Sequence, residues 1–262
     1  MQQLLPSASG AEVELAEVDL HEHYAGAGWL DSGGVRVNFI ASADGAASFA
    51  GLSRGLQTPG DNRVFAALRD LADVILVGAA TATAEGYRPS APGANRRAIR
   101  SGYGLAEAPA IAVMSASLNL DLSAPLYAGA QAAPTVVITS SAAPVGRRND
   151  IIDLAGSGAR LQLIEAPAAD AGGVDFAAAV ANLRELGYRR ILCEGGPRLF
   201  AAGVAAAAVD ELCLSYSPLL AGPLGSRILA GTAELTGFPA RLELISLLEE
   251  DSALFARYRL PR

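Results

Sequence analysis

Apolar residues recur along this chain with two different periods, and segments of the two kinds follow one another. Residues 35–41 alternate apolar and polar side chains as a strand does. Residues 61–72 place apolar side chains at helical spacing, which predicts an amphipathic helix with Asp61 as its N-cap. Residues 74–78 form a continuous apolar run, which is typical of strands buried on both faces. A helix between two strands predicts a βαβ unit.

The alternation of strands and helices continues to the end of the chain. A second helix is expected to begin at Asp175 and stop at Gly187, and a third to run from Pro197 through Ala208. A turn at 250–252 is expected to join the last two strands. The apolar runs that predict further strands are 110–114, 135–139, 161–164, 190–193, 210–215, 242–248 and 253–260.

These elements predict an α/β fold with a mostly parallel central sheet, flanked by helices and completed by an antiparallel C-terminal hairpin. Residues 1–30 are acidic and weakly patterned, so we expect a lead segment that lies over the body, with no signal peptide. Residues 31–262 contain no repeat and no clear linker, and we expect them to form a single domain. Prolines and polar residues interrupt the longest uncharged stretch, 122–146, so it is not expected to span a membrane.

Composition removes several classes of chemistry. The net charge of −7 argues against nucleic acid as the main partner. All 20 basic residues are arginine, which excludes a Walker A loop and a Schiff-base lysine. His21 and His23, the two histidines, form no HExxH motif, and we expect no metal site. Cys193 and Cys213 lie in apolar runs, so we expect buried free thiols and a cytoplasmic protein. The chemistry must come from an organic cofactor or from carboxylates.

The end of one predicted strand carries the sequence Glu-Gly-Gly-Pro-Arg-Leu, residues 194–199. Gly195 and Gly196 expose backbone amides, and Pro197 is preset for the first helical position. Free amides at a helix N-terminus suit a phosphate or pyrophosphate. An ordinary strand-to-helix turn would also explain this segment, but a carboxylate at the end of a buried strand, Glu194, is costly unless it binds something.

Two other strand ends could face the same ligand, because ligands of open α/β sheets bind beyond the carboxyl ends of parallel strands. Residues 77–81 place small side chains and the Thr81 hydroxyl after a buried strand. Residues 42–45 end in Asp44-Gly45, which is also a common turn dipeptide. Each segment by itself is equally compatible with a structural turn.

Taken in order, these segments resemble one family. The pattern comprises A-S-A-D-G at 41–45, L-R-D-L-A-D-V-I-L-V-G-A-A-T at 68–81, E-G-G-P-R-L at 194–199 and V-D-E-L at 209–212. It is similar to the reductase domain of the bifunctional riboflavin-biosynthesis deaminase/reductase, and most of all to the stand-alone actinobacterial members. The resemblance covers roughly residues 34–260 and implies a dihydrofolate-reductase-like fold.

The resemblance implies hydride transfer from NADPH, so that the protein mainly positions the cofactor and substrate. Asp44 and Glu194 would be the catalytic residues, facing substrate and nicotinamide, and either one could donate a proton or order a water. The residues implied to bind the cofactor are Ala41, Gly78, Thr81, Ser115, Gly195, Gly196, Pro197, Arg198 and Leu199.

The chain departs from the family pattern at three places. Ala43 replaces a leucine, and Ala116 stands where relatives often have a basic residue that reads the 2′-phosphate. Residues 83–89 replace the D-D-P-x-L-x-x-R stretch that contacts the ribose phosphate of the substrate, which leaves Arg88, Arg96 and Arg97 as candidates. The zinc deaminase signature is absent, which excludes a deaminase.

The leading hypothesis is a stand-alone, homodimeric NADPH-dependent reductase of 5-amino-6-(5-phosphoribosylamino)uracil or a related pyrimidine. The small-molecule substrate is then the main partner, without nucleic acid or membrane. One alternative is reduction of dihydrofolate or another pterin on the same fold. A second alternative is a non-catalytic dinucleotide-binding protein.

Overall fold

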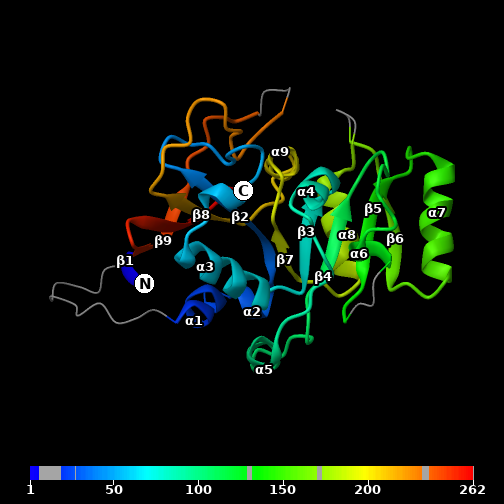
Figure 1. The fold of residues 1–262 in the computed structure, drawn as a ribbon, viewed down its shortest axis with the longest axis horizontal. Coiled ribbons are helices and arrows are strands. Elements are labelled where there is room, and N and C mark those ends of the chain that lie inside the picture. Colours follow the sequence, from blue (N-terminus) through cyan, green and yellow to red (C-terminus); the bar gives the residue numbers. More distant parts are fainter. Residues whose placement is uncertain (6–18, 27, 129–131, 170–172, 232–235, 262) are drawn as a thin grey trace.

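The computed structural model describes residues 1–5, 19–26, 28–128, 132–169, 173–231 and 236–261. Within these residues the strands form one mixed sheet, which runs from β1 on the left of Figure 1 to β6 on the right. The strands are β1 (Gln2–Leu5), β2 (Gly34–Ser42), β3 (Val74–Gly78), β4 (Ala110–Met114), β5 (Thr135–Ser140), β6 (Leu161–Ala166), β7 (Arg190–Cys193), β8 (Glu211–Ser217), β9 (Glu243–Glu250) and β10 (Ala253–Arg259). Their order in the sheet is β1-β9-β10-β8-β2-β7-β3-β4-β5-β6.

The seven neighbouring strands from β8 to β6 are parallel, and the other end of the sheet is antiparallel. β9 and β10 form the expected C-terminal hairpin, with Asp251 and Ser252 at its turn in left-handed conformations. The predicted fold class, a mostly parallel sheet with an antiparallel hairpin, is therefore confirmed. Apolar runs located these strands well because parallel strands are buried on both faces.

The first 30 residues are more closely integrated than the expected lead segment. β1 pairs with β9 and adds an edge strand to the sheet. Two short helices, α1 (Leu20–Ala25) and α2 (Trp29–Ser32), bring Tyr24 and Trp29 into the core beside α3 (Pro59–Asp70). Residues 6–18, also part of the expected lead segment, lie outside the described residues. These elements escaped the sequence reading because each is too short to show a period.

The core lies on both faces of the sheet. α8 (Phe176–Glu185) and α9 (Pro197–Ala205) cover one face, where Phe176, Leu183 and Phe200 pack on β2, β3 and β7. Alternate residues of each strand point to opposite faces, so Leu76 joins this core while Val77 joins another one. The remaining helical elements are η1 (Arg54–Leu56), α4 (Ala79–Ala84), α5 (Ala94–Gly102), α6 (Pro125–Ala128) and α7 (Val145–Gly156), the last lying beyond β6 in Figure 1.

Helix α3 begins earlier than predicted. Thr58 is its N-cap, and the Thr58 hydroxyl accepts a hydrogen bond from the Asp61 amide at 3.1 Å. Pro59 takes the first helical position, as the fixed φ of proline favours. The prediction of Asp61 as the N-cap is therefore wrong. Asp61 lies in the first turn of the helix, and its side chain is free for another role.

The two cysteines are free and buried, as predicted. Burial raises the pKa of both thiols to about 12, so neither is a reactive thiolate. In the part of the chain that the structure describes, no helix is both long enough and apolar enough to cross a bilayer.

The order of strands reverses at the middle of the sheet. After β2 the chain moves outward through β3, β4, β5 and β6, returns with β7 between β2 and β3, and then places β8 on the other side of β2. The connections that follow the carboxyl ends of β2, β7 and β3 therefore run in different directions and leave a crevice between them. Open α/β sheets bind their ligands in such a crevice.

Candidate functional site

A cavity of about 700 Å³ opens at the carboxyl ends of β2, β7 and β3. Its walls come from segments that are distant in sequence: the end of β2, the loop around η1, helix α3, helix α4 with the loop that follows it, and the residues after β7. Pockets that hold small molecules and cofactors span roughly 300–1,000 Å³. The cavity is therefore large enough for a ligand and lies where the topology favours one.

Two glycines follow β7 in a tightly packed turn, and the second of them, Gly196, is part of the cavity wall. The Gly78 amide donates a hydrogen bond to the Gly195 carbonyl at 2.7 Å, which ties this turn to the end of β3. Gly195 has a φ of 77°, and a Cβ there would lie 2.6 Å from the Phe39 ring. A Cβ on Gly196 would lie 2.4 Å from the Thr81 hydroxyl oxygen. Neither distance accommodates a side chain, so both positions require glycine.

Helix α9 begins directly at this turn. Gly196 is the N-cap and provides no side chain to the first amides, while Pro197 occupies the first helical position. The unpaired N–H groups of a helix N-terminus carry partial positive charge and favour anions. Gly196 and Pro197 both line the cavity, so the uncapped end of α9 borders it. This arrangement fits the phosphate-binding turn that the sequence predicts.

The cavity brings together only some of the predicted cofactor residues. Thr81, Gly196 and Pro197 line it. Ala41, Ser115 and Leu199 are buried behind neighbouring side chains, and the Arg198 side chain is exposed beyond the turn. The predicted cofactor residues that do not line the cavity are Ala41, Gly78, Ser115, Gly195, Arg198 and Leu199.

Glu194 lies in the cavity wall as predicted, but it is firmly paired. Nε and Nη2 of Arg69 donate to the two carboxylate oxygens of Glu194, each at 2.7 Å. The Tyr87 hydroxyl donates to the same carboxylate. Burial, and then the charge of Glu194, raises the pKa of Tyr87 well above its usual value, so the phenol keeps its proton. Arg69 and Tyr87 donate to both carboxylate oxygens of Glu194, so this side chain is held in place as an acceptor and is better placed to order a water than to donate a proton.

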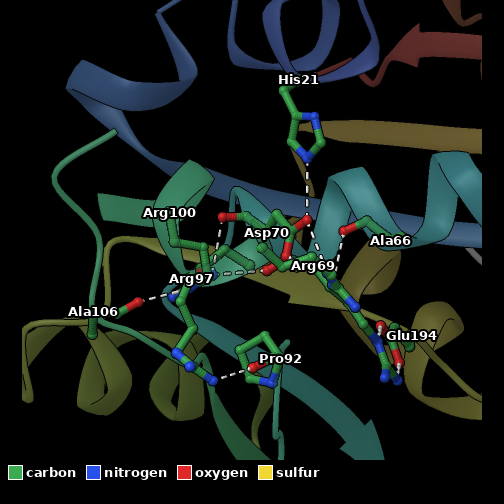
Figure 2. A network of polar contacts seen from close by, with 11 residues as sticks. His21, Ala66, Arg69, Asp70, Pro92, Arg97, Arg100, Ala106 and Glu194 are labelled. Carbon is green, nitrogen blue, oxygen red and sulfur yellow. Dashed lines mark hydrogen bonds and ion pairs between the residues drawn. The ribbon is translucent and has the colours of Figure 1, made fainter. Parts of the chain in front are cut away.

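The last turn of α3 is held by arginines of α5, a group that the sequence reading did not connect to the site. In Figure 2, Arg69 points toward Glu194, while the next residue, Asp70, points toward His21. Asp70 accepts from Nε of Arg96 at 2.7 Å and from His21 at 3.1 Å. The orientation of Arg69, and with it the Glu194 ion pair, therefore depends on how α3 is held at this end.

Asp44, just after β2, is held by the backbone of the segment that follows β8. Its carboxylate accepts hydrogen bonds from the amides of Ala221 and Gly222, at 3.0 and 2.8 Å, and from the Ser42 hydroxyl. These bonds, the one from Ser42 first, lower the pKa of Asp44 to about 2. Asp44 is exposed and does not line the cavity. The structure thus supports a clamp that holds the segment after β8 to the end of β2, and does not support a proton donor.

Besides Arg69, three arginines line the cavity. Arg54 comes from η1, Arg88 from the loop after α4, and Arg96 from α5. Sequence reasoning proposed Arg88 and Arg96 for a phosphate and left Arg54 out, because a single loop arginine carries no signal. Arg97, the other candidate, donates to the Pro92 carbonyl at 2.8 Å and does not line the cavity.

A fourth arginine lies near the predicted adenosine end. The Ser115 hydroxyl accepts from the Leu118 amide at 3.1 Å and so holds the loop that follows β4. Arg147 of α7 donates to the Leu118 carbonyl at 3.2 Å and to the Asn119 side chain at 3.3 Å. A basic residue is therefore present beside Ser115 in space, although Ala116 follows it in sequence.

Comparisons with known proteins agree with this geometry. The family model of the RibD C-terminal domain matches residues 34–254. A 2,5-diamino-6-ribosylamino-4(3H)-pyrimidinone 5′-phosphate reductase of Archaeoglobus fulgidus is 27% identical over 226 residues, which are 86% of this chain and 97% of the relative.

Solved structures show the same fold. A pyrimidine reductase-like protein of Corynebacterium diphtheriae superposes with a TM-score of 0.78 at 25% identity, covering 94% of this chain and all of the other. RibD of Acinetobacter baumannii superposes with a TM-score of 0.67 at 16% identity over 88% of this chain and 58% of the larger protein. The dihydrofolate-reductase-like fold expected from the motifs is confirmed, and the chain belongs to the RibD C-terminal domain family of reductases.

Proposed function

We propose that this pyrimidine reductase of riboflavin biosynthesis uses NADPH to reduce the ribosyl group of a 6-(5-phosphoribosylamino)pyrimidine. The substrate is 5-amino-6-(5-phosphoribosylamino)uracil or its 2,5-diamino analogue, the compound that the Archaeoglobus fulgidus relative is named for. The observation that carries the proposal is the turn of Gly195 and Gly196, which has no side chains and whose Gly196 lines the cavity at the uncapped start of α9.

The residues present fit a nicotinamide dinucleotide. A pyrophosphate requires closely approaching backbone amides, and the Gly196 N-cap of α9 adds no side chain to them; a Cβ there would also collide with the Thr81 hydroxyl on the same wall. Arg147, beside the loop of Ser115, supplies a positive charge for the 2′-phosphate and favours NADPH over NADH. When bound, the cofactor supplies the hydride.

The proposed reaction opens the ribose ring of the substrate and then reduces its C1′ carbon. In the substrate, the bond from C1′ to the ring oxygen of ribose breaks, a C1′=N double bond forms, and the N–H proton moves to the freed oxygen. Addition of a hydride to C1′ and of a proton to nitrogen then gives the ribitylamino product. The protein must bind the phosphate, hold C1′ beside the hydride donor and stabilise the positive charge of the protonated C1′=N group.

The cavity offers groups for each of these tasks. Arg54, Arg88 and Arg96 can bind the 5′-phosphate of the substrate, replacing the family motif that residues 83–89 lack. Glu194, held by Arg69, places a carboxylate on the wall, where it stabilises a cation and orders a water as proton source. Asp44 contributes by fixing the segment after β8.

We also infer a cytoplasmic homodimer. Free buried thiols fit a reducing compartment. Leu220 and Leu224, after β8, are 81% and 98% exposed, which leaves apolar surface for a second copy to cover. Sedimentation of the purified protein would show a dimer, and a monomer at micromolar concentration would contradict this.

Titration of cofactor fluorescence with NADPH and NADH tests the cofactor site. Gly196→Asp places a carboxylate against the pyrophosphate, and we expect it to weaken binding of both cofactors at least tenfold. Arg147→Ala should weaken binding of NADPH and leave NADH unchanged. Gly93→Asp makes the same substitution at the glycine N-cap of α5, where the added Cβ meets open space, and serves as the control. Unchanged binding in Gly196→Asp would overturn the placement of the phosphates.

Turnover tests the reaction. NADPH oxidation with either ribosylaminopyrimidine, together with formation of the ribityl product, supports the proposal. Oxidation with dihydrofolate alone would move the assignment to a pterin reductase, and cofactor binding without any turnover would indicate a non-catalytic protein.

A further inference from the structure

One buried carboxyl group in the cavity has no cationic partner. Asp61, in the first turn of α3, is 5% exposed and lines the cavity. Among the described residues no arginine or histidine forms an ion pair with it, and the side chain that hydrogen-bonds to it is Ser215 of β8. The two other buried carboxylates of the described residues are paired, Asp70 with Arg96 and Glu194 with Arg69. Asp61 is therefore an exception that calls for a ligand.

Burial makes the ionised form of the Asp61 carboxyl group unfavourable. Burial raises the pKa of Asp61, and the single hydrogen bond from Ser215 only partly opposes the shift. Tyr24 of α1, whose phenol is also fully buried, lies close enough to interact with the same charge. An ionised carboxylate left in such a place is expensive, and N–H donors of a bound molecule would offset the cost.

A second polar group on the same floor of the cavity lacks a partner. Asn38 of β2 is 9% exposed and lines the cavity, and its side-chain oxygen has no hydrogen-bond partner in the described part of the chain. Asn38 and Ile40 point to the same face of the sheet, and Ile40 is the register partner of Ser215. Asn38, Ser215 and Asp61 therefore belong to one polar floor, formed by β2, β8 and α3.

We propose that Asp61 is the specificity-determining residue of the reductase and that it binds the N–H edge of a 2-amino-4-oxopyrimidine. This ring presents its ring N–H and its exocyclic amino group side by side, two parallel donors that match the two oxygens of a carboxylate. A uracil ring presents a carbonyl oxygen in place of the amino group, and that oxygen would face a carboxylate oxygen. Asn38 supplies a further amide on the same floor.

The inference rests on the proposed function and narrows it to one substrate. Of the two ribosylaminopyrimidines, the enzyme would prefer the 2,5-diamino compound over the 5-aminouracil. A site built to pair with an N–H donor discriminates strongly against an analogue that lacks it, and we expect at least a tenfold difference in kcat/KM.

The test compares the two substrates, with NADPH, in the wild type and in Asp61→Asn. An asparagine amide offers one acceptor and one donor, which match the N–H and carbonyl of uracil, so the variant should lose at least tenfold of the preference or reverse it. NADPH affinity, measured separately, should not change. Asp153→Asn makes the same change on the exposed surface of α7 and should keep the wild-type ratio.

The wild-type ratio alone can overturn the inference, whether or not the variant folds. A wild-type enzyme that reduces the uracil as well as or better than the diamino compound contradicts it, and so does an Asp61→Asn enzyme with an unchanged ratio. Failure of both substrates to oxidise NADPH would instead refute the proposed function. A preference for the diamino compound that Asp61→Asn abolishes supports the assignment.

Discussion

Replacing Gly196 with alanine tests the central feature of the site, because the new methyl group meets a fixed neighbour. The Cβ would lie 2.4 Å from the Thr81 hydroxyl oxygen, whereas φ at this position is −73° and suits alanine. The effect is therefore steric and not a matter of backbone conformation. Forcing an extra methyl into a packed site costs about 1–3 kcal/mol, and alanine is a poorer N-cap than glycine by about 0.5–1 kcal/mol.

A matched control separates the two contributions. Gly93 is also a helix N-cap without a side-chain bond, with a φ of −64° and open space where a Cβ would be. Gly93→Ala should therefore lose only the capping contribution of about 0.5–1 kcal/mol. Gly196→Ala should lose about 1.5–4 kcal/mol, the sum of the capping and steric contributions. Thr81→Ala, combined with Gly196→Ala, removes the clashing oxygen and should recover about 1–3 kcal/mol as a coupling energy.

Equilibrium unfolding in urea measures these free energies, and NADPH titration of the folded variants measures the effect on binding. We expect Gly196→Ala to weaken NADPH binding. The Thr81 double variant should recover stability more than affinity, because it relieves the clash but also removes a hydroxyl that lines the cavity. Equal unfolding free energies for the Gly196 and Gly93 variants, or a coupling energy near zero, would refute the close approach of this turn to Thr81.

Three further predictions concern charged groups. Glu194→Gln leaves the Arg69 guanidinium without its carboxylate partner and should lower the free energy of unfolding by about 3 kcal/mol, measured by urea unfolding. The same variant should have a reduced kcat in steady-state kinetics. Burial, and then the charges of Arg257 and Arg36, lower the pKa of His23 to about 4, so between pH 6.5 and 4 the unfolded chain binds a proton at His23 that the folded chain does not. The contribution of His23 to the free energy of unfolding is therefore complete above pH 6.5 and falls by about 1–2 kcal/mol, after solvent screening, as the pH drops toward 4. Urea unfolding at several pH values should show this slope in the wild type and a flatter slope in His23→Gln. Asp44→Ala should speed hydrogen exchange at the amides of Ala221 and Gly222 without changing NADPH affinity.

The sequence predicted the sheet better than it predicted the site. Buried parallel strands read as continuous apolar runs, and the runs at 110–114 and 190–193 coincide with β4 and β7. The glycine turn was also visible, because two adjacent glycines before a proline have few structural alternatives. Short elements such as β1 and α4 carry too few residues for a period and were missed.

The charged residues of the site show why their roles could not be predicted from the sequence. Glu194 and Arg69 are 125 positions apart, so their pairing becomes visible only in three dimensions. Asp61 had a plausible local explanation as an N-cap, and this hid the buried carboxyl that lines the cavity. Asp44 matched a family motif, yet the nearby amides of Ala221 and Gly222 determine what its side chain does. A motif identifies a residue, whereas its partners decide its role.

At the end of α3, the structure shows why a lysine could not replace one of the arginines of this chain. Arg100 is fully buried, and its guanidinium donates through Nη1 to the carbonyls of Arg69, Asp70 and Ala72 and through Nε to that of Ala106. A lysine ammonium is a compact point charge that cannot span these acceptors in a planar fork, and it loses its proton far more readily when buried. Because those carbonyls belong to the turn that carries Arg69, the guanidinium of α5 fixes the arginine that holds Glu194. Arg69, Arg96 and Arg100 thus serve as internal braces in this protein, which leaves the backbone amides of the glycine turn for the role that we propose, binding the pyrophosphate.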